Sequence, residues 1–462
     1  MEQYDVIIVG GGPAGYVAAI RAAKNGKKIA LVEKSYLGGT CLNRGCIPSK
    51  TLLRHTEVIE DIKSADAWGI KVSNLTFSFD EMLNRKDKVI ETLRGGIKHL
   101  LQSGKIEVYD GEATIDKDKQ VKVAVSKNDI LTISADNILV ATGSKPAVPP
   151  IEGVDKVHYH TTDTIFNLTE IPNSITIIGG GVIGVEMANI FSSLNVKVTV
   201  VEMGDRLIPS EDKDASKALL KSLKKKGINV LTKHQVLSIS EENGVKRMTT
   251  SSKKEGNKTI ESSEVLIAVG RKPNLSAVDS LDLKKNGPFI EVDDYLETSI
   301  QGIFAAGDVI GRLQLAHVAS EEGLMAIENM DNKNHTIDYQ QMPRCIYTKP
   351  EVASIGYNEQ ELIDKNIVYR IGKYNFSGNG KALAMGETEG FLKVLVDSEY
   401  GEVLGVTMIG SRVTEMIGQA GAYLQLEGTV DELAGLTQAH PSLSEGIMEV
   451  ANSLIGKGIH VS

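Results

Sequence analysis

The sequence predicts an α/β protein with two nucleotide-binding folds of the Rossmann type. Each fold is indicated by an apolar strand, a Gly-x-Gly-x-x-Gly motif, a helix, and a second strand followed by glutamate. In both copies the glutamate lies 23 positions after the first glycine (10 to 33 and 179 to 202). From about residue 340 the pattern changes to strands and amphipathic helices, which indicates a further α+β domain.

Length and charge limit the range of functions that the protein could have. The 462 residues suffice for about three domains. A net charge of −9 without long Lys/Arg runs argues against nucleic acid or an anionic membrane as a partner. No apolar run approaches the ~18 residues of a membrane span. With no visible signal peptide and only three cysteines, we expect a soluble, cytoplasmic protein.

The first nucleotide-binding fold begins with the strand at 4–9 and continues through a helix to about Asn25. Its glycines let the backbone approach a pyrophosphate at the helix N-terminus, and the acid binds ribose hydroxyls. A turn without a ligand is the alternative, which the combination of strand, helix and acid disfavours. The residues predicted to bind here are Gly10, Gly12, Ala14, Gly15, Glu33 and Lys34.

The second fold repeats this arrangement, with strands at 175–178 and 196–201. Two folds imply two nucleotides, and a reductase needs both an electron store and a hydride carrier. Glutamate at the end of the second strand favours NAD, because an acid there binds the ribose diol and repels a 2′-phosphate. The predicted binding residues are Gly179, Gly181, Ile183, Gly184 and Glu202.

Residues 38–50, GGTCLNRGCIPSK, contain two of the three cysteines, Cys41 and Cys46. A disulfide needs Cα atoms about 4.4–6.8 Å apart, whereas five residues of straight helix rise about 7.5 Å. The backbone must therefore bend if the sulfurs pair, and Gly45 and Pro48 permit a bend. Lys50, four residues after Cys46, favours a thiolate there. Two buried thiols that never meet are the alternative.

This string resembles the redox-disulfide signature of the flavin disulfide reductases (class I pyridine nucleotide-disulfide oxidoreductases), most closely their dihydrolipoamide dehydrogenase branch. Arg44 departs from the pattern, since the family more often has a small apolar residue there. The resemblance implies FAD in the first fold, NAD in the second, and the second fold inserted in the first. It also implies a redox disulfide, with Cys41 as the interchange sulfur and Cys46 against the flavin.

Further motifs extend the resemblance along the chain. They are ATGSKP at 141–146, GRKPN at 270–274, and a second flavin motif at 298–308, whose aspartate binds the ribityl chain in the family. Leu315–His317 resembles the short helix that covers the isoalloxazine. The further cofactor residues that the resemblance implies are Gly39, Thr40, Lys50, Gly111, Ala113, Thr142, Gly143, Val236, Ala268, Gly270, Arg271, Asp308 and Ala316.

The segment HPSLSE at 440–445 resembles the family's catalytic His–Glu pair. On spacing alone, His440 would more often be a surface or core residue. In the family role, His440 accepts a proton from a substrate thiol and Glu445 orients its imidazole. Lys50 is expected near flavin N5 and paired with Glu186, and an ordinary interdomain salt bridge is the alternative. Cys345 is expected to be a small buried hydrophobe, and no metal site is predicted.

The resemblance implies a homodimer that oxidises protein-bound dihydrolipoamide and passes hydride through FAD to NAD⁺. The expected domains are 1–143 (FAD, first part), 144–269 (NAD), 270–339 (FAD/central, second part) and 340–462 (dimerisation). A lipoylated protein would act in trans, either the E2 of a 2-oxoacid dehydrogenase or the glycine cleavage H protein. The alternatives are another NAD(P)H-dependent reductase, such as glutathione reductase, and a non-catalytic flavin-binding sensor, which would not need His440 and Glu445.

Overall fold

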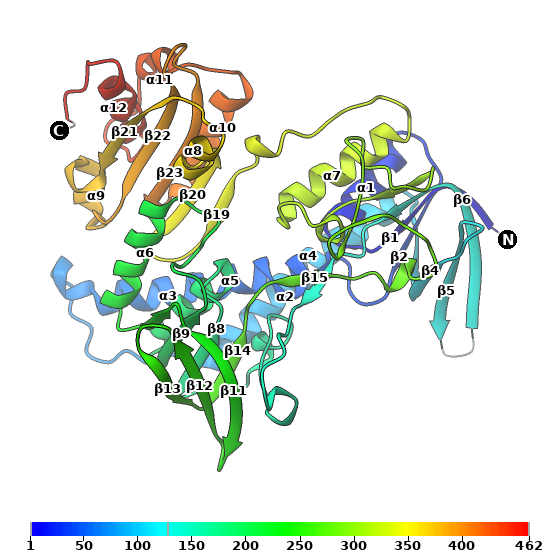
Figure 1. Cartoon of the computed structure of the whole chain (residues 1–462), viewed down its shortest axis with the longest axis horizontal. Helices are drawn as coiled ribbons and strands as arrows, with labels where there is room; N and C mark the ends of the chain where they lie inside the picture. Colours follow the sequence, from blue (N-terminus) through cyan, green and yellow to red (C-terminus); the bar gives the residue numbers. More distant parts are fainter. Residues whose placement is uncertain (1, 127–128, 461–462) are drawn as a thin grey trace.

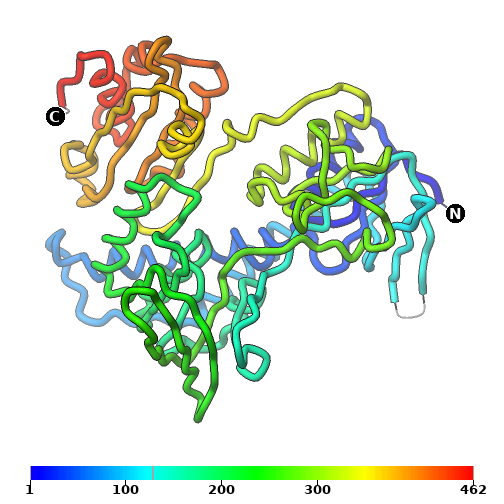
Figure 2. Tube along the Cα trace, in the orientation of Figure 1, coloured from blue at the N-terminus to red at the C-terminus, as the bar shows by residue number. Residues whose placement is uncertain are grey.

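The computed structural model describes residues 2–126 and 129–460. Figure 1 shows three blocks: a sheet around the N-terminal strand, a second sheet in green, and a C-terminal block in orange and red. The trace in Figure 2 places the two chain ends in different blocks, at opposite sides of the molecule. No helix within these residues has the length and apolar character needed to cross a bilayer.

The first block is built on a seven-stranded sheet. Its strands are β1 (Glu2–Val9), β2 (Ile29–Glu33), β3 (Glu107–Asp110), β4 (Glu112–Ile115), β5 (Gln120–Ser126), β6 (Asp129–Val140) and β18 (Ile303–Ala305). The order is β3-β2-β1-β6-β5-β4, and β18 also pairs with β6. β1 lies between β2 and β6 in parallel pairing, and its residues 6–8 are fully buried. Such a continuous apolar run is typical of a parallel strand covered on both faces.

Five helices accompany this sheet. They are α1 (Pro13–Lys24), α2 (Gly39–Arg44), α3 (Cys46–Lys63), α4 (Phe79–Ser103) and α7 (Ala316–Asn329). α1 packs against α7, although the two helices are about 300 positions apart in sequence. The break between α2 and α3 falls at Gly45, whose φ of −137° and ψ of −106° are not helical. The bend expected between the two cysteines is therefore present.

The second block has a parallel four-stranded sheet of order β10-β9-β8-β14 and a three-stranded antiparallel sheet. The strands are β8 (Ser174–Ile178), β9 (Lys197–Glu202), β10 (Asn229–Thr232), β11 (Gln235–Glu242), β12 (Val245–Ser252), β13 (Gly256–Ser262) and β14 (Glu264–Ile267), and the helices are α5 (Val182–Ser193) and α6 (Lys213–Lys225). The strand–glycine turn–helix unit therefore occurs in both blocks, as predicted.

A two-stranded antiparallel ribbon joins these two blocks. It pairs β7 (Ser144–Pro146), where the chain leaves the first sheet, with β15 (Arg271–Pro273), where the chain returns. After the return, a short hairpin forms from β16 (Lys285–Asn286) and β17 (Phe289–Ile290), and β18 then joins β6. The second nucleotide fold is thus inserted within the first, as expected from the resemblance.

The C-terminal block is an antiparallel sheet of order β19-β20-β23-β22-β21 with helices. Its elements are β19 (Arg344–Ile346), β20 (Glu351–Gly356), β21 (Tyr369–Asn375), β22 (Phe391–Asp397), β23 (Val403–Gly410), α8 (Glu359–Asp364), α9 (Gly380–Met385), α10 (Val413–Gln425), α11 (Val430–Gly435) and α12 (Glu445–Leu454). α10 and α12 pack on the sheet, and β23 also meets α6 of the second block. The α+β prediction for this region is confirmed.

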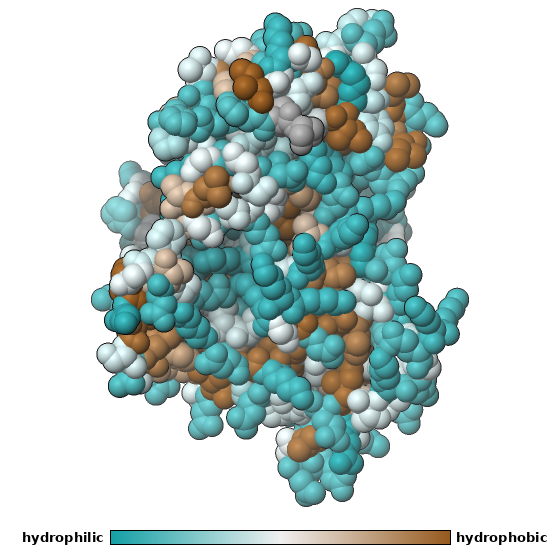
Figure 3. All heavy atoms as spheres, turned by 90° about the vertical axis from the view of Figure 1, so that its left-hand side faces the viewer, coloured by the Kyte–Doolittle hydropathy of each residue, from teal (hydrophilic) through white to brown (hydrophobic). Residues whose placement is uncertain are grey.

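One hydrophobic core joins α3, the second sheet and the C-terminal block. Leu52 and Leu53 of α3 belong to the same buried cluster as Val185 of α5 and Ile409 of β23. The helix that begins at the second cysteine is therefore anchored against two other blocks. On the face that Figure 3 shows, hydrophilic residues predominate and apolar residues form several separate groups.

Candidate active site

A cavity of about 1780 Å³ lies between the two nucleotide folds and the C-terminal block. This volume exceeds the ~300–1,000 Å³ typical of a pocket for one small ligand. The residues predicted from the sequence that line it are Gly10, Gly12, Ala14, Glu33, Lys34, Gly39, Thr40, Cys41, Cys46, Lys50, Thr142, Gly143, Gly179, Gly181, Ile183, Glu186, Glu202, Val236, Ala268, Gly270, Arg271, Asp308 and Ala316.

Six predicted site residues lie outside this cavity. Gly111 and Ala113 line a small adjoining pocket that also includes Lys34. Gly15 and Gly184 lie beneath the glycine turns, where they allow the helix to pack closely on the strand. His440 and Glu445 line neither pocket. Within one chain, the structure thus gathers the cysteines and both nucleotide loops but leaves the His–Glu pair apart from them.

The two nucleotide loops have nearly the same geometry. Gly10 and Gly179 have φ values of +111° and +110°, and a Cβ on either would lie 2.2–2.3 Å from the carbonyl oxygen of the residue that follows the neighbouring strand, β6 or β14. Glu33 accepts hydrogen bonds from the backbone amides of Gly11 (2.7 Å) and Ser35 (2.8 Å). Glu202 accepts from the corresponding amide, that of Gly180, at 2.6 Å. Each carboxylate is therefore fixed at its turn, where a ribose diol can bind, so the residues fit two dinucleotides.

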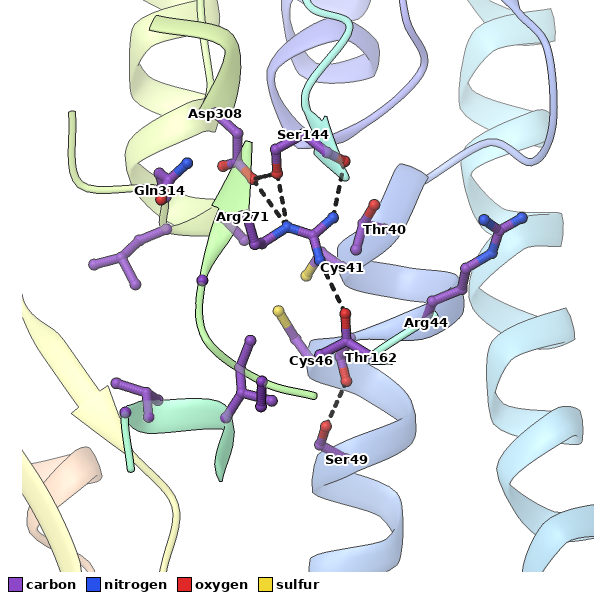
Figure 4. Close-up of a pocket in the computed structure, with 18 of the residues that line it drawn as sticks. Thr40, Cys41, Arg44, Cys46, Ser49, Ser144, Thr162, Arg271, Asp308 and Gln314 are labelled. Atoms are coloured by element: carbon purple, nitrogen blue, oxygen red, sulfur yellow. Dashed lines mark hydrogen bonds and ion pairs between the residues drawn. The ribbon is translucent and has the colours of Figure 1, made fainter. Parts of the chain in front are cut away.

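The two redox cysteines point toward each other from successive helices, as Figure 4 shows. Cys41 lies in α2, Cys46 is the first residue of α3, and both are free thiols. Cys41 is hydrogen-bonded to Cys46; this bond and burial raise the pKa of Cys41. The same bond, aided by the nearby Lys50 ammonium, lowers the pKa of Cys46 to about 7. In the dithiol form Cys46 is thus the thiolate and Cys41 keeps its proton.

Lys50 and Glu186 form an ion pair between α3 and α5. The Lys50 amino group lies 2.9 and 3.0 Å from the two carboxylate oxygens of Glu186, whose side chain is 4% exposed. Glu186 also accepts a hydrogen bond from the backbone amide of Tyr347, and the Lys50 amino group stands 4.4 Å from the centre of the Tyr347 ring. This pair therefore links all three blocks at the cavity wall, as an interdomain salt bridge would.

Arg271 connects several side chains at the cavity wall (Figure 4). It donates to the Ser144 hydroxyl at 2.7 Å and to the Thr162 hydroxyl at 3.0 Å, and its Nε lies 3.7 Å from Asp308. Ser144 lies within the ATGSKP motif, but neither it nor Thr162 was predicted as a site residue, because their partner Arg271 lies more than 100 positions away in the sequence. The pairing of β7 with β15 is the signal that would have pointed to Ser144.

Arg44, which departs from the family pattern, and Cys345, the third cysteine, both lie at the cavity wall. Arg44 lies 3.5 Å from Asp163 and donates to the Ser35 hydroxyl at 3.2 Å, so it joins α2 to the segment that enters the second block. Cys345 was expected to be a small buried hydrophobe. It is partly buried: it packs against the core of the C-terminal block and also lines the cavity, and burial raises its pKa to about 11.

His440 and Glu445 form a hydrogen-bonded pair in the C-terminal block. Nδ1 of His440 lies 2.8 Å from one Glu445 oxygen, and the other oxygen accepts from the Ser442 amide at 2.8 Å. The carboxylate is thereby fixed and orients the imidazole. The His440 side chain is 80% exposed in the single chain, so its ring is open to a second molecule.

The sequence pattern of the pyridine nucleotide-disulphide oxidoreductases matches residues 4–323, and that of their dimerisation domain matches residues 342–451. The chain belongs to this family. As a member of the pyridine nucleotide-disulphide oxidoreductases with the dimerisation domain, it forms a homodimer.

Relatives within the family are similar to this chain over nearly their whole length. A dihydrolipoyl dehydrogenase of Bacillus subtilis (strain 168) is 41% identical, covering 99% of both chains. One from Geobacillus stearothermophilus is 37% identical, covering 99% of this chain and 98% of its own. Among solved structures, LpdA from Mycobacterium tuberculosis is similar with a TM-score of 0.90 and 26% identity, covering 98% of this chain and 100% of its own.

Proposed function

We propose that this protein is a dihydrolipoyl dehydrogenase, which oxidises protein-bound dihydrolipoyl groups with NAD⁺. The observation that carries the proposal is the unequal cysteine pair at the wall of a cavity that both nucleotide folds share. When bound, FAD supplies a two-electron carrier between the dithiol and the pyridine nucleotide. The full-length similarity to dihydrolipoyl dehydrogenases favours this activity over the glutathione-reductase-like alternative.

The cysteines exchange electrons with the substrate by thiol–disulfide exchange. A dihydrolipoyl thiolate attacks Sγ of Cys41, the Cys41–Cys46 bond breaks, and Cys46 leaves as a thiolate. The second dihydrolipoyl sulfur then attacks the first, which releases Cys41 and closes the lipoyl disulfide. Two electrons thus pass from the substrate to the cysteine pair. The low pKa of Cys46 supports its role as the leaving thiolate, since a more acidic thiol leaves faster.

His440 accepts the proton of the attacking substrate thiol, and Glu445 holds the imidazole in place. We propose that the dithiol served by His440 belongs to the partner subunit. Within one chain the imidazole lies outside the cavity of the cysteines and is exposed. A two-fold interface would bring the two groups together and would make two equivalent sites per dimer.

We propose that the first fold holds FAD, with Glu33 at the ribose, and that the second holds NAD, with Glu202 at the ribose. Asp308 lies beside the first fold, where it would bind the ribityl chain. Gly111 and Ala113, which line the adjoining pocket with Lys34, would contact the adenosine part of the FAD. Lys50 contributes positive charge next to Cys46 and would lie near N5 of the bound flavin.

We propose the domain boundaries 1–143, 144–269, 270–339 and 340–462, which the β7–β15 ribbon and the separate C-terminal sheet support. The lipoyl group comes from a second protein, the E2 of a 2-oxoacid dehydrogenase or a glycine cleavage H protein. A cytoplasmic location accords with Cys345, a thiol outside the redox pair, because reducing compartments preserve such thiols.

A substrate panel tests the proposal. The purified holoenzyme should turn over dihydrolipoamide with NAD⁺, and kcat/KM should favour NAD⁺ over NADP⁺ by more than about tenfold, which corresponds to about 1.4 kcal/mol. The physical reason is repulsion between the Glu202 carboxylate and the 2′-phosphate. Faster reduction of glutathione disulfide with NADPH would overturn the assignment.

A further inference from the structure

Three side chains that can ligate a metal meet at the edge of the second sheet, away from the redox cysteines. They are His158, His160 and Glu264, whose ligating atoms all lie within 4.8 Å of one another. The His160 amide donates to the Val265 carbonyl, and its carbonyl accepts from the Ile267 amide, each at 2.8 Å. The segment 158–160 therefore runs alongside β14. Because side chains alternate along an extended strand, both imidazoles face the same side.

His160 is a buried imidazole whose hydrogen-bonding capacity is unused. The residue is 7% exposed, and neither ring nitrogen has a hydrogen-bond partner among the described residues. Buried polar atoms are nearly always satisfied, because leaving one without a partner costs about 1–3 kcal/mol. A ligand that accepts a nitrogen lone pair would remove this penalty.

A simple ion pair between His160 and Glu264 does not explain the arrangement. The Glu264 oxygen that lies 3.4 Å from Nε2 of His160 already accepts from the buried Lys246 amino group at 3.1 Å. Lys246 is held independently by the Ser263 carbonyl at 2.6 Å. Glu264 thus has a charge partner without His160, and its other carboxylate oxygen accepts no hydrogen bond within the ranges that the structure describes.

The spacing between His160 and Glu264 is that of two ligands on one small metal ion. Two atoms each about 2.0–2.1 Å from a tetrahedral zinc ion lie roughly 3.3 Å apart, and Nε2 of His160 stands 3.4 Å from the Glu264 oxygen. The exposed ring of His158 lies 4.9 Å from that of His160, centre to centre, so a rotation of this free side chain closes the site.

We propose that His158, His160 and Glu264 bind one divalent transition-metal ion of the zinc class. Two imidazoles and one carboxylate are ligands that suit zinc, nickel or copper, and water would complete a tetrahedral shell. Calcium requires six to eight oxygen ligands and magnesium an octahedral set of oxygens, so neither fits.

The bound ion would fasten residues 158–160 to β14 where the chain enters the redox cavity. Two residues after His160, the Thr162 hydroxyl accepts from Arg271, and Asp163 lies 3.5 Å from Arg44. The site is therefore separate from the thiols but continuous with the cavity wall.

Zinc binding to the oxidised holoenzyme tests the proposal, because the Cys41–Cys46 disulfide keeps those sulfurs from competing. Equilibrium dialysis against zinc chloride should give one zinc per chain. His158→Ala removes an exposed imidazole and leaves the fold intact, and we expect it to raise the dissociation constant by about tenfold or more, the loss of at least about 1.4 kcal/mol of binding. Glu264→Gln should act in the same direction.

The matched control is His99→Ala, which removes another exposed imidazole, on α4, and should bind zinc like the unaltered protein. Zinc should also raise the thermal unfolding midpoint of the unaltered protein and of His99→Ala but not of His158→Ala, because a ligand that binds only the native state stabilises it. Equal zinc affinity in His158→Ala and the unaltered protein would overturn the proposal. The proposal would also be overturned if Cys345→Ser no longer bound zinc while His158→Ala still did.

Discussion

The hydrogen bond between Cys41 and Cys46 makes two chemically identical residues unequal. It raises the pKa of Cys41 and lowers that of Cys46 to about 7. Cys46 also begins α3, so the amide groups of the first turn favour a negative sulfur. The Cys41 sulfur is therefore suited to receive the substrate's attack, and the Cys46 sulfur is suited to hold negative charge.

Replacing either sulfur separates the two roles. Cys41→Ser should keep FAD bound and abolish lipoamide turnover. The remaining Cys46 thiolate should then give a long-wavelength charge-transfer absorption with oxidised flavin, recorded by visible spectroscopy. Cys46→Ser is the matched control and should lack this band. If Cys46→Ser shows the band and Cys41→Ser does not, the two roles are reversed.

The charges around Cys46 set the pH range of its thiolate. In the two-electron-reduced enzyme the charge-transfer band should fade as pH falls through about 7, because Cys46 gains a proton. Lys50→Met removes a cation and should move this midpoint upward, whereas Glu186→Gln removes an anion and should move it downward, each by about 1 pH unit. Spectrophotometric titration measures both. Unchanged midpoints would mean that the pair serves only as a salt bridge between the blocks.

At the scale of the element, the glycines of a strand–turn–helix unit have different structural roles. A Cβ on Gly184 would lie 2.0 Å from the Gly179 carbonyl oxygen, so this glycine lets α5 pack on the turn. A Cβ on Gly181 would meet no atom within 4 Å, and Gly181 lines the cavity. Gly184 is therefore needed for helix packing, and Gly181 leaves space beside a ligand.

Two alanine substitutions distinguish these tasks. Gly184→Ala should destabilise the protein by about 1–3 kcal/mol, a typical effect of overpacking, seen as a lower thermal unfolding midpoint. Gly181→Ala should leave the midpoint unchanged but raise KM for NAD⁺, because the methyl group occupies space that the pyrophosphate would approach. An unchanged KM in Gly181→Ala would remove that glycine from the nucleotide site.

At the scale of the whole molecule, the proposed shared site would be complete only in the dimer. The cysteines occupy a cavity between blocks, and His440 is exposed on the C-terminal block of the same chain. His440 lies within the part of the chain that matches the family's dimerisation domain, residues 342–451. A site shared between subunits reconciles these positions.

Mixed dimers test the shared site. Cys41→Ser and His440→Gln should each be inactive as homodimers. Dissociating and reassembling an equal mixture makes half of the dimers mixed, and each mixed dimer has one site with an intact disulfide and an intact imidazole. About a quarter of the normal activity should return, since separate sites act independently. If His440 serves its own chain, every site carries a defect and no activity returns.

The sequence by itself determined the fold class, the number of nucleotide folds and the position of the redox segment. These features are encoded locally: a turn with Gly10 at positive φ, a glutamate 23 positions later, and a glycine that breaks the helix between Cys41 and Cys46. Strand and helix periodicity act over a few residues, so their signal survives without knowledge of the tertiary structure. Resemblance to a family added the order of FAD and NAD and the pairing of Lys50 with Glu186.

The tertiary structure decided which distant residues meet. Arg271 reaches Ser144 across 127 positions, and Cys345, which packs against the C-terminal core, also lines the redox cavity. His158 and Glu264 lie more than 100 positions apart, and no spacing in the sequence joins them. These contacts depend on how strands such as β7 and β15 pair and how the three blocks pack. A single sequence predicts the local conformation of each element. Which distant residues become neighbours is decided only when the elements pack around a common core.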